Sequence, residues 1–196
     1  MSRPALLVID PQVDFLALVE PGGPHTCGAD AALAGMERLV AAARSGGTPL
    51  VVTQELHRPG RVDFGRELDG EEPVHCVEGT PGAELVEALR PRPGEHLVRK
   101  RRYSAFFATD LDLLLRGLGV DTIVACGLLS DVCVHYTSVD AHQLDLRVHV
   151  VPEACAGSSA AASLAAFAAV EYLQRDAVVT LEAAVGLLDY AATNEA

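Results

Sequence analysis

Tryptophan is absent from this sequence, aromatic residues are few, and lysine occurs once, at Lys100. Aromatic residues make up 5 % of the 196 residues, whereas hydrophobic residues of all types make up 49 %. The core must therefore be built mainly from Ala, Val and Leu, which favours helices packed on a sheet. Because arginine fills the other basic positions, the one retained ammonium, a compact donor on a thin stem, marks Lys100 as a candidate functional residue. The alternative is a chance survivor on the surface, where most lysines lie.

Positive charge is scarce as well. Lys and Arg together number 15 against 27 for Asp and Glu, which gives a formal net charge of −12. Nucleic acids and anionic membranes are bound through basic patches, and the run RKRR at 99–102 is too short to make one. We therefore expect no nucleic-acid partner and no membrane partner.

The sequence also lacks long hydrophobic runs and paired cysteines. The apolar run ALLVI at 5–9 is too short for the core of a signal peptide, and no segment of the sequence reaches membrane-spanning length. The 5 cysteines show no CxxC spacing of a zinc ribbon or redox motif, and they fit free thiols in a reducing compartment. They are Cys27, Cys76, Cys126, Cys133 and Cys155. These observations predict a cytoplasmic protein.

Apolar, β-branched runs bounded by turn residues recur along the chain, and each is typical of a buried strand. They lie at 5–10, 49–54, 96–100, 122–127, 147–151 and 177–181. Segments with helical spacing lie at 29–46, 82–89, 109–119, 130–145 and 158–176. Strands that alternate with helices imply right-handed crossovers and a parallel sheet covered on both faces. We therefore predict one domain over residues 1–196, a three-layer α/β/α fold with a Rossmann-like open parallel sheet of about six strands.

The carboxyl ends of the predicted strands should carry the functional site, because the ligand crevice of an open parallel sheet lies there. Four candidate side chains follow or end the first four strands, and they are Asp10, Glu55, Lys100 and Cys133. We expect them to converge on one cleft. The long segment 56–82, rich in Gly, Pro and charge and without clear periodicity, is predicted to be a functional loop beside it.

Three of these side chains could form an activated nucleophile. Ser130 looks like a helix N-cap, which puts Cys133 in the first turn, where unpaired N–H groups and the helix dipole should lower the pKa of the thiol. Asp10 could accept the thiol proton, and Lys100 could hold the pair in line. Taken singly, Cys133 could equally be an inert core cysteine and Asp10, before Pro11, a turn residue.

The chain resembles the isochorismatase-like cysteine hydrolases, a family that includes nicotinamidases, carbamoylsarcosine amidases, biuret hydrolases and streptothricin hydrolases. The resemblance covers nearly the whole sequence, in the family's order and spacing. It runs through LLVIDPQVDF, VVTQELH, HCVEGTPGAEL, KRRYSAFFATDLDLLLRGLGVDTIVACG and SDVCVHYTSVDAHQLDLRVHVVPEA.

The resemblance implies a catalytic triad of Asp10, Lys100 and Cys133 that hydrolyses an amide, carbamoyl or ureido C–N bond of a small molecule through a thioester. It also implies a cis peptide bond between Leu128 and Leu129. The backbone N–H groups of Leu129 and Cys133 would then form the oxyanion hole. Phe15 and Leu128 are the expected substrate-binding residues.

A metal site is a further candidate. Nicotinamidases bind a divalent metal through an Asp-x-His pair and a later His, and this chain offers Glu55, His57 and His75 instead. Two imidazoles with a carboxylate suit zinc, iron or manganese. The alternative is that these residues line the substrate pocket or hydrogen-bond within the long loop.

The resulting prediction is a cysteine amidohydrolase that requires no cofactor and has the option of a divalent metal. One alternative is an isochorismatase-type vinyl ether hydrolase, which needs no cysteine nucleophile. Another is a non-catalytic binding domain on the same fold, which has no chemical need for Asp10, Lys100 and Cys133 together. A homo-oligomer is also expected, since the Ala-rich helical segment 158–174 could pack against a second subunit.

Overall fold

The computed structural model describes residues 2–20, 22 and 27–189, and within them the chain forms a parallel sheet of 5 strands in the order β3-β2-β1-β4-β5. The strands are β1 (Pro4–Ile9), β2 (Leu50–Glu55), β3 (His96–Lys100), β4 (Thr122–Leu128) and β5 (Arg147–Ala156). Residues 5–9 of β1 and all of β4 are buried, as expected for central strands of a parallel sheet that is covered on both faces.

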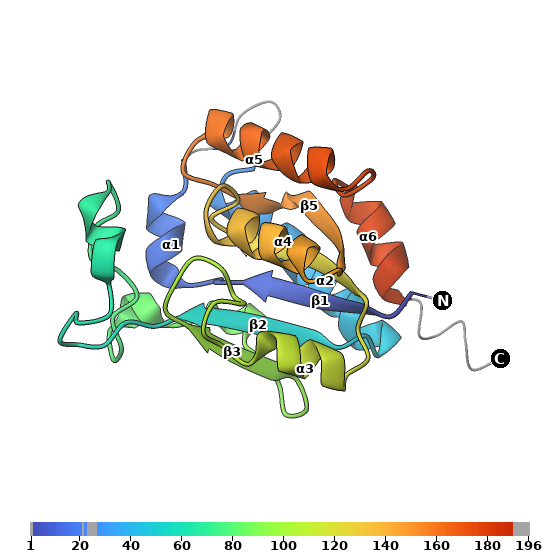
Figure 1. The fold of residues 1–196 in the computed structure, drawn as a ribbon, viewed down its shortest axis with the longest axis horizontal. Helices are drawn as coiled ribbons and strands as arrows, with labels where there is room; N and C mark the ends of the chain where they lie inside the picture. Colours follow the sequence, from blue (N-terminus) through green and yellow to red (C-terminus); the bar gives the residue numbers. More distant parts are fainter. Residues whose placement is uncertain (1, 21, 23–26, 190–196) are drawn as a thin grey trace.

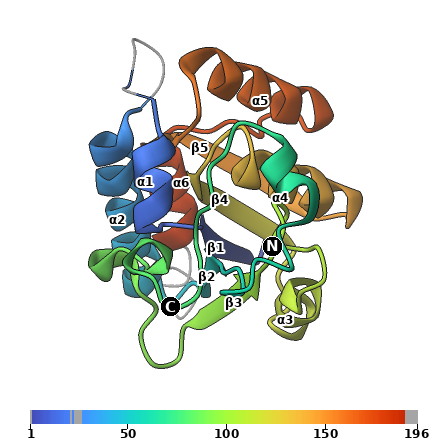
Figure 2. The ribbon, with the colours of Figure 1, turned by 90° about the vertical axis from the view of Figure 1, so that its left-hand side faces the viewer.

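Helices cover both faces of the sheet, so the predicted three-layer fold is confirmed. They are α1 (Val13–Leu18), α2 (Ala29–Gly46), α3 (Leu111–Gly117), α4 (Cys133–Gln143), α5 (Ala160–Leu173) and α6 (Leu181–Leu188). Figure 2 looks onto the carboxyl ends of the strands, with α1, α2 and α6 on one side of the sheet and α3 and α4 on the other. Helix α2 shows why such helices form here, because its buried residues recur at helical spacing and make one apolar face.

The segment between β2 and β3 lies across the carboxyl ends of the strands, teal to green in Figure 1. It contains short 3-10 turns at Gly65–Asp69, Pro81–Ala83 and Glu87–Leu89. The predicted helix at 82–89 is therefore wrong. Leu85 instead forms an antiparallel bridge with Gln12, and the Val86 N–H donates to the carbonyl of Pro11 at 2.8 Å, which holds this stretch extended against the loop that precedes α1.

The sixth predicted strand, at 177–181, is reduced to one parallel bridge between Val150 and Val178. Thr180 explains why this stretch stops pairing, because its side chain accepts a hydrogen bond from the Ala183 N–H at 3.2 Å and caps α6. Neither α6 nor α1 was predicted from the sequence pattern.

The exposed residues of α5 and the lengths of the helices relate to two expectations, a second subunit and the absence of a membrane partner. Leu164, Tyr172 and Leu173 of α5 are 44 %, 90 % and 40 % exposed, and association of subunits through this helix stays a prediction. Every helix in the described part of the chain is too short or too polar to cross a bilayer.

Candidate active site

The parallel register brings the predicted side chains to one end of the sheet. Glu55 pairs with Lys100 across β2 and β3, and β1 lies between β2 and β4. Gly127 allows β4 to approach β1 closely, since its φ is +134° and a Cβ there would lie 2.0 Å from the carbonyl oxygen of Ile9. Asp10, Glu55, Lys100 and Cys133 are all buried, and they meet as the strand order predicts.

The ammonium of Lys100 is the centre of this group. Its Nζ lies 2.7 Å from Asp10 Oδ2 and 3.3 Å from Cys133 Sγ, and it donates a short hydrogen bond to Glu55 Oε2. It also donates to the carbonyl oxygen of Arg102 at 2.9 Å. Lys100 is 1 % exposed, so it is not a surface lysine that survived by chance. A compact ammonium fits among these groups, where a planar guanidinium would not.

Burial and the mutual charges of these groups shift their pKa values. Burial alone would lower the pKa of Lys100, but Asp10, Cys133 and Glu55 raise it well above its ordinary value of 10.5. Burial raises the pKa of Asp10 above 3.8, with Lys100 opposing and Glu55 adding to the shift. A carboxylate with a raised pKa is a better proton acceptor, which suits a general base.

The thiol of Cys133 differs from its predicted state. Burial raises its pKa well above 9.0, although Lys100 acts in the opposite direction. The predicted lowering of the thiol pKa by the helix N-terminus is therefore wrong, because the thiol is fully buried beside Asp10 and Glu55. The resting group is a thiol, and an attack by sulfur must be accompanied by removal of its proton.

The start of α4 also differs from the prediction. The helix begins at Cys133 with Val132 as its N-cap residue, and Ser130 makes no cap. Ser130 is buried, and its hydroxyl hydrogen-bonds the hydroxyl of Ser163 in α5 at 2.8 Å. The sequence suggested that Ser130 caps the helix that follows it. Its side chain instead contacts a residue that is distant along the chain.

The peptide bond between Leu128 and Leu129 is cis, as the family resemblance implies. Both residues are buried where β4 ends, immediately before the turn into α4. The N–H groups of Leu129 and Cys133 remain the predicted oxyanion hole. Leu128 and Phe15 remain predicted substrate contacts, and the Phe15 ring lies 5.2 Å from the ring of His75.

Asp10 is held in place by Thr53, a residue that was not predicted to belong to the site. The Thr53 hydroxyl donates to Asp10 Oδ1 at 2.7 Å, and the Asp10 N–H donates to the same hydroxyl oxygen at 3.0 Å. Asp10 has a φ of 47°, in the left-handed region that Asp tolerates better than most residues. A hydroxyl at the end of the neighbouring strand was the only sequence signal for this contact.

A second buried cluster adjoins the first through Glu55. The Oε1 atom of Glu55 lies 3.2 Å from His57 Nε2 and 2.9 Å from His75 Nε2, while its other oxygen contacts Lys100. Glu67 joins this cluster, with its Oε1 3.2 Å from His75 Nε2 and 3.6 Å from His57 Nε2. Nothing in the sequence singles out Glu67, because its loop has no periodicity that indicates where a side chain points.

Residues Glu55, His57, Glu67 and His75 fit a divalent cation. Each offers one ligand atom, and these atoms lie within 4.8 Å of one another. His75 Nδ1 hydrogen-bonds the carbonyl oxygen of Pro73 at 2.7 Å, and this contact directs Nε2 towards the carboxylates. Histidines that bind metals are commonly oriented by such a hydrogen bond from the other ring nitrogen. Both Glu67 oxygens are buried without a hydrogen-bond partner among the described residues. Two imidazoles and two carboxylates are suitable ligands for zinc, iron or manganese.

The carboxylates and imidazoles of this cluster shift one another's pKa values. Burial would lower the pKa of both histidines, but Glu55 and Glu67 raise it to about 9 for His57 and about 10 for His75. Burial would raise the pKa of Glu55, yet Lys100 and the two histidines hold it well below 4.5. The two carboxylates therefore require positive charge at the histidine Nε2 atoms, which protons or a metal ion can supply.

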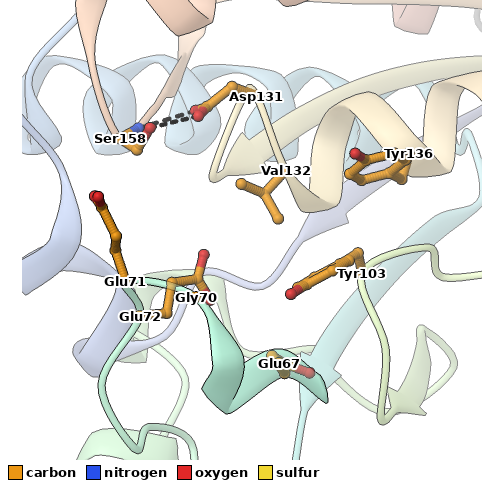
Figure 3. A pocket seen from close by; sticks show the side chains of 9 residues that line it. All are labelled: Glu67, Gly70, Glu71, Glu72, Tyr103, Asp131, Val132, Tyr136 and Ser158. Atoms are coloured by element: carbon orange, nitrogen blue, oxygen red, sulfur yellow. Dashed lines mark hydrogen bonds between the residues drawn. The ribbon is translucent and has the colours of Figure 1, made fainter. Parts of the chain in front are cut away.

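A cavity of about 320 Å³ opens beside these clusters. Its lining includes Glu67 and Val132, the residue immediately before Cys133 (Figure 3). Loop 67–72, Tyr103 and the start of α4 form its walls. The thiol of Cys133 itself is 1 % exposed and is not among the residues that line the cavity.

Comparisons with known proteins show the family to which the chain belongs. The Isochorismatase domain family model matches residues 4–183. A maleamate amidohydrolase of Pseudomonas putida is 39 % identical over 158 residues, which cover 79 % of this chain and 72 % of that protein. A nicotinamidase of Acinetobacter baylyi is 30 % identical over 181 residues, covering 77 % of this chain and 80 % of that protein. The crystal structure of the pyrazinamidase of Pyrococcus horikoshii in complex with zinc matches with a TM-score of 0.75 and 28 % identity, covering 91 % of this chain and 98 % of that one. The family expected from the sequence motifs is confirmed, and the chain belongs to the isochorismatase family.

Proposed function

We propose that this protein is a cysteine-dependent amidohydrolase that cleaves the C–N bond of a carboxamide, carbamoyl or ureido group in a small molecule. The observation that carries the proposal is the buried ammonium of Lys100, which contacts Asp10, Glu55 and the thiol of Cys133 at once. The proposal is supported by relatives named as maleamate amidohydrolase and nicotinamidase. A vinyl ether hydrolase or a binding domain gives no reason to bury a base, a cation and a thiol together.

The first half of the reaction forms a thioester. As Cys133 Sγ attacks the carbonyl carbon, the thiol proton passes to the carboxylate of Asp10. One oxygen of this carboxylate lies within 4.8 Å of the sulfur. The N–H groups of Leu129 and Cys133 stabilise the oxyanion. The C–N bond then breaks, Asp10 returns the proton to the departing nitrogen, and ammonia or an amine leaves.

The second half returns the enzyme to its resting state. Water attacks the thioester carbonyl and gives a proton to Asp10, and the C–S bond breaks to release the carboxylic acid. The proton then returns from Asp10 to the sulfur. Lys100 keeps its proton throughout, because its pKa is raised well above 10.5, and it acts by attracting the carboxylate and the sulfur.

A divalent metal held by Glu55, His57, Glu67 and His75 is part of the proposal, with zinc, iron and manganese as the candidates. When bound, such an ion supplies Lewis-acid polarisation and a fixed point for orienting a substrate. The residues themselves keep the Glu55 carboxylate ionised beside Lys100 and so hold the ammonium in line with the thiol. Cys133, Asp10 and Lys100 supply the nucleophile, the base and the cation, so activation of the thiol is proposed not to require the metal.

The direct test measures ammonia release from nicotinamide, biuret, N-carbamoylsarcosine, ureidoacrylate, maleamate and simple amides. Cys133→Ala should abolish release, whereas Cys27→Ala, which changes a partly exposed free cysteine, should keep it. Equal release by wild-type protein and Cys133→Ala would refute the nucleophile. Absence of release from every compound, together with cleavage of isochorismate, would replace the proposal with the vinyl ether activity.

A further inference from the structure

The two carboxylate oxygens of Asp10 have different surroundings. Oδ1 accepts a hydrogen bond from the hydroxyl of Thr53 at 2.7 Å. Oδ2 lies 2.7 Å from the ammonium nitrogen of Lys100, yet it is buried without a hydrogen-bond partner among the described residues. One oxygen is therefore occupied by a hydrogen, whereas the other faces a positive charge and keeps its lone pairs free.

The ammonium of Lys100 has no hydrogen left for Oδ2. A lysine ammonium carries three hydrogens. They are directed to Glu55 Oε2, to the carbonyl oxygen of Arg102 at 2.9 Å and to Cys133 Sγ at 3.3 Å. Lys100 thus attracts the Asp10 carboxylate through its charge, and this attraction does not fix the direction in which the carboxylate lone pairs point.

The orientation of the Asp10 carboxylate comes from Thr53. An aspartate carboxylate has a broad range of angles about its last side-chain torsion unless a partner restricts it. The Thr53 hydroxyl oxygen accepts the Asp10 N–H at 3.0 Å, and its single hydrogen is donated to Oδ1. Both residues are 0 % exposed, so solvent does not compete for these bonds. A donor that is itself held by the Asp10 backbone therefore sets the plane of the carboxylate.

Glu55 provides the other carboxylate beside the thiol, with Oε2 3.8 Å from Cys133 Sγ. Both of its oxygens are already occupied. Oε2 accepts a hydrogen bond from Lys100, and Oε1 lies 3.2 and 2.9 Å from the Nε2 atoms of the two cluster histidines. Of these two carboxylates, only that of Asp10 has an oxygen, Oδ2, with room for a proton.

We propose, on the basis of the amidohydrolase function above, that Thr53 is a positioning residue that makes Oδ2 of Asp10 the oxygen that takes up and returns the proton. The proton passes from Cys133 Sγ to Oδ2 as the sulfur attacks, and from Oδ2 to the departing nitrogen as the C–N bond breaks. In the second half of the reaction it passes from water to Oδ2 and then to the sulfur. The Thr53 hydroxyl keeps its own hydrogen throughout, bonded to Oδ1.

Substitutions of Thr53 test this role through the turnover of an amide that the wild-type protein hydrolyses. Thr53→Val replaces the hydroxyl with a methyl group of similar size, in a strand that favours branched side chains. We expect kcat and kcat/KM to fall together by about 10- to 100-fold, because a base displaced by about 1 Å loses rate on that scale. KM should stay within about twofold, since the lost interaction acts in the transition state. Thr53→Ser should restore kcat to within about threefold of wild type, because serine keeps the hydroxyl and lacks only the branched restraint on χ1.

Thr48→Val is the matched control, just before the opposite end of β2. Thr48 is also buried, and its hydroxyl donates to the carbonyl oxygen of Leu188 at 2.6 Å. This substitution likewise removes a buried hydroxyl, so it should lower the midpoint of urea denaturation and leave kcat unchanged. A loss of kcat that merely followed stability would appear in both valine variants and would overturn the inference. Wild-type kcat in Thr53→Val would do the same, as would equal losses in Thr53→Val and Thr53→Ser.

Alkylation of Cys133 by iodoacetamide measures the proton transfer without any C–N cleavage, because the thiol must lose its proton to react. Mass spectrometry locates the product on Cys133. The rate should fall roughly tenfold in Thr53→Val and return in Thr53→Ser. Burial raises the pKa of Asp10, and the Thr53 hydrogen bond is among the contacts that oppose this rise, so the valine variant has a stronger base that is less well placed. Alkylation of Thr53→Val at the wild-type rate or faster would therefore contradict control by position.

The two measurements separate this inference from the amidohydrolase proposal. If no amide is hydrolysed but alkylation of Cys133 depends on Thr53 in this way, the positioning role stands and the amidohydrolase proposal fails. If amides are hydrolysed but Thr53→Val keeps the wild-type kcat and alkylation rate, the positioning role fails alone.

Discussion

Replacing Lys100 with arginine should leave the protein folded and remove most of its amide turnover. The ammonium contacts Asp10 Oδ2 at 2.7 Å, the Arg102 carbonyl at 2.9 Å and Cys133 Sγ at 3.3 Å, in addition to Glu55. A guanidinium is wider and planar, so it cannot place one nitrogen at the centre of these contacts without moving the thiol or the base. A displacement of about 1 Å at such a site costs on the order of 100-fold in rate, and we expect at least that loss in kcat.

The folding energetics of the same position give an independent measurement. Lys100→Met leaves Asp10 and Glu55, both 0 % exposed, without their common cation, and breaking a buried ion pair in this way costs roughly 3–5 kcal/mol of unfolding free energy. Lys100→Arg keeps the charge and adds only the strain of overpacking, roughly 1–3 kcal/mol. Urea denaturation should therefore rank wild type, Lys100→Arg and Lys100→Met in falling order of stability.

Ammonia release and urea denaturation should be measured on the same preparations. Arg99→Lys is the matched control, because it exchanges the same two residue types at the exposed neighbouring position of β3 and should change neither quantity. The reasoning about the compact ammonium is refuted if Lys100→Arg turns over amides as fast as the wild-type protein.

Three further predictions concern stability, backbone and metal. Glu95→Gln should lower the unfolding free energy by about 1 kcal/mol near neutral pH, a figure kept small by solvent screening, because Arg44 binds this carboxylate at 2.7 and 3.0 Å. Hydrogen bonds from Arg44 lower the pKa of Glu95 below 4.5, so its contribution is fully present above the unfolded pKa and is lost as pH falls through the folded pKa. The difference in urea midpoint between Glu95→Gln and wild type should therefore shrink as the pH falls below 4.5 and vanish once the pH is below the folded pKa. Gly127→Ala should cost at least about 2 kcal/mol in urea denaturation, because its φ is +134° and the new Cβ would meet the carbonyl oxygen of Ile9; wild-type stability would contradict the close approach of β1 and β4. Glu67→Gln should weaken zinc binding about 10- to 100-fold in calorimetry, and unchanged binding would remove Glu67 from the ligand set.

The parts of the site that sequence predicted well are those fixed by strand ends. Asp10, Glu55 and Lys100 follow apolar runs whose parallel pairing brings their ends together, so strand order alone places them in one crevice. Cys133 follows the same logic, since the next strand leads directly into its helix. Regular alternation of strands and helices likewise predicted the layers, because each element must bury an apolar face.

The parts that sequence could not predict depend on contacts distant along the chain. Ser130 resembles a local helix cap, yet Ser163 of a different helix takes its hydroxyl. Glu67 lies in a loop without periodicity, and only the folding of that loop across the sheet brings it to His75. The short apolar run at 177–181 has too few residues for periodicity to separate a strand from the start of a helix. In each case tertiary packing decided what the local pattern left open.

The most direct test of the central claim is intact-mass spectrometry of the protein after acid quenching during turnover of an amide that releases ammonia. The account predicts a transient species heavier than the free protein by the mass of the substrate minus ammonia, carried on Cys133 and absent in Cys133→Ala. Rapid ammonia release without any acyl species on Cys133, or with equal turnover in Cys133→Ala, would contradict the account.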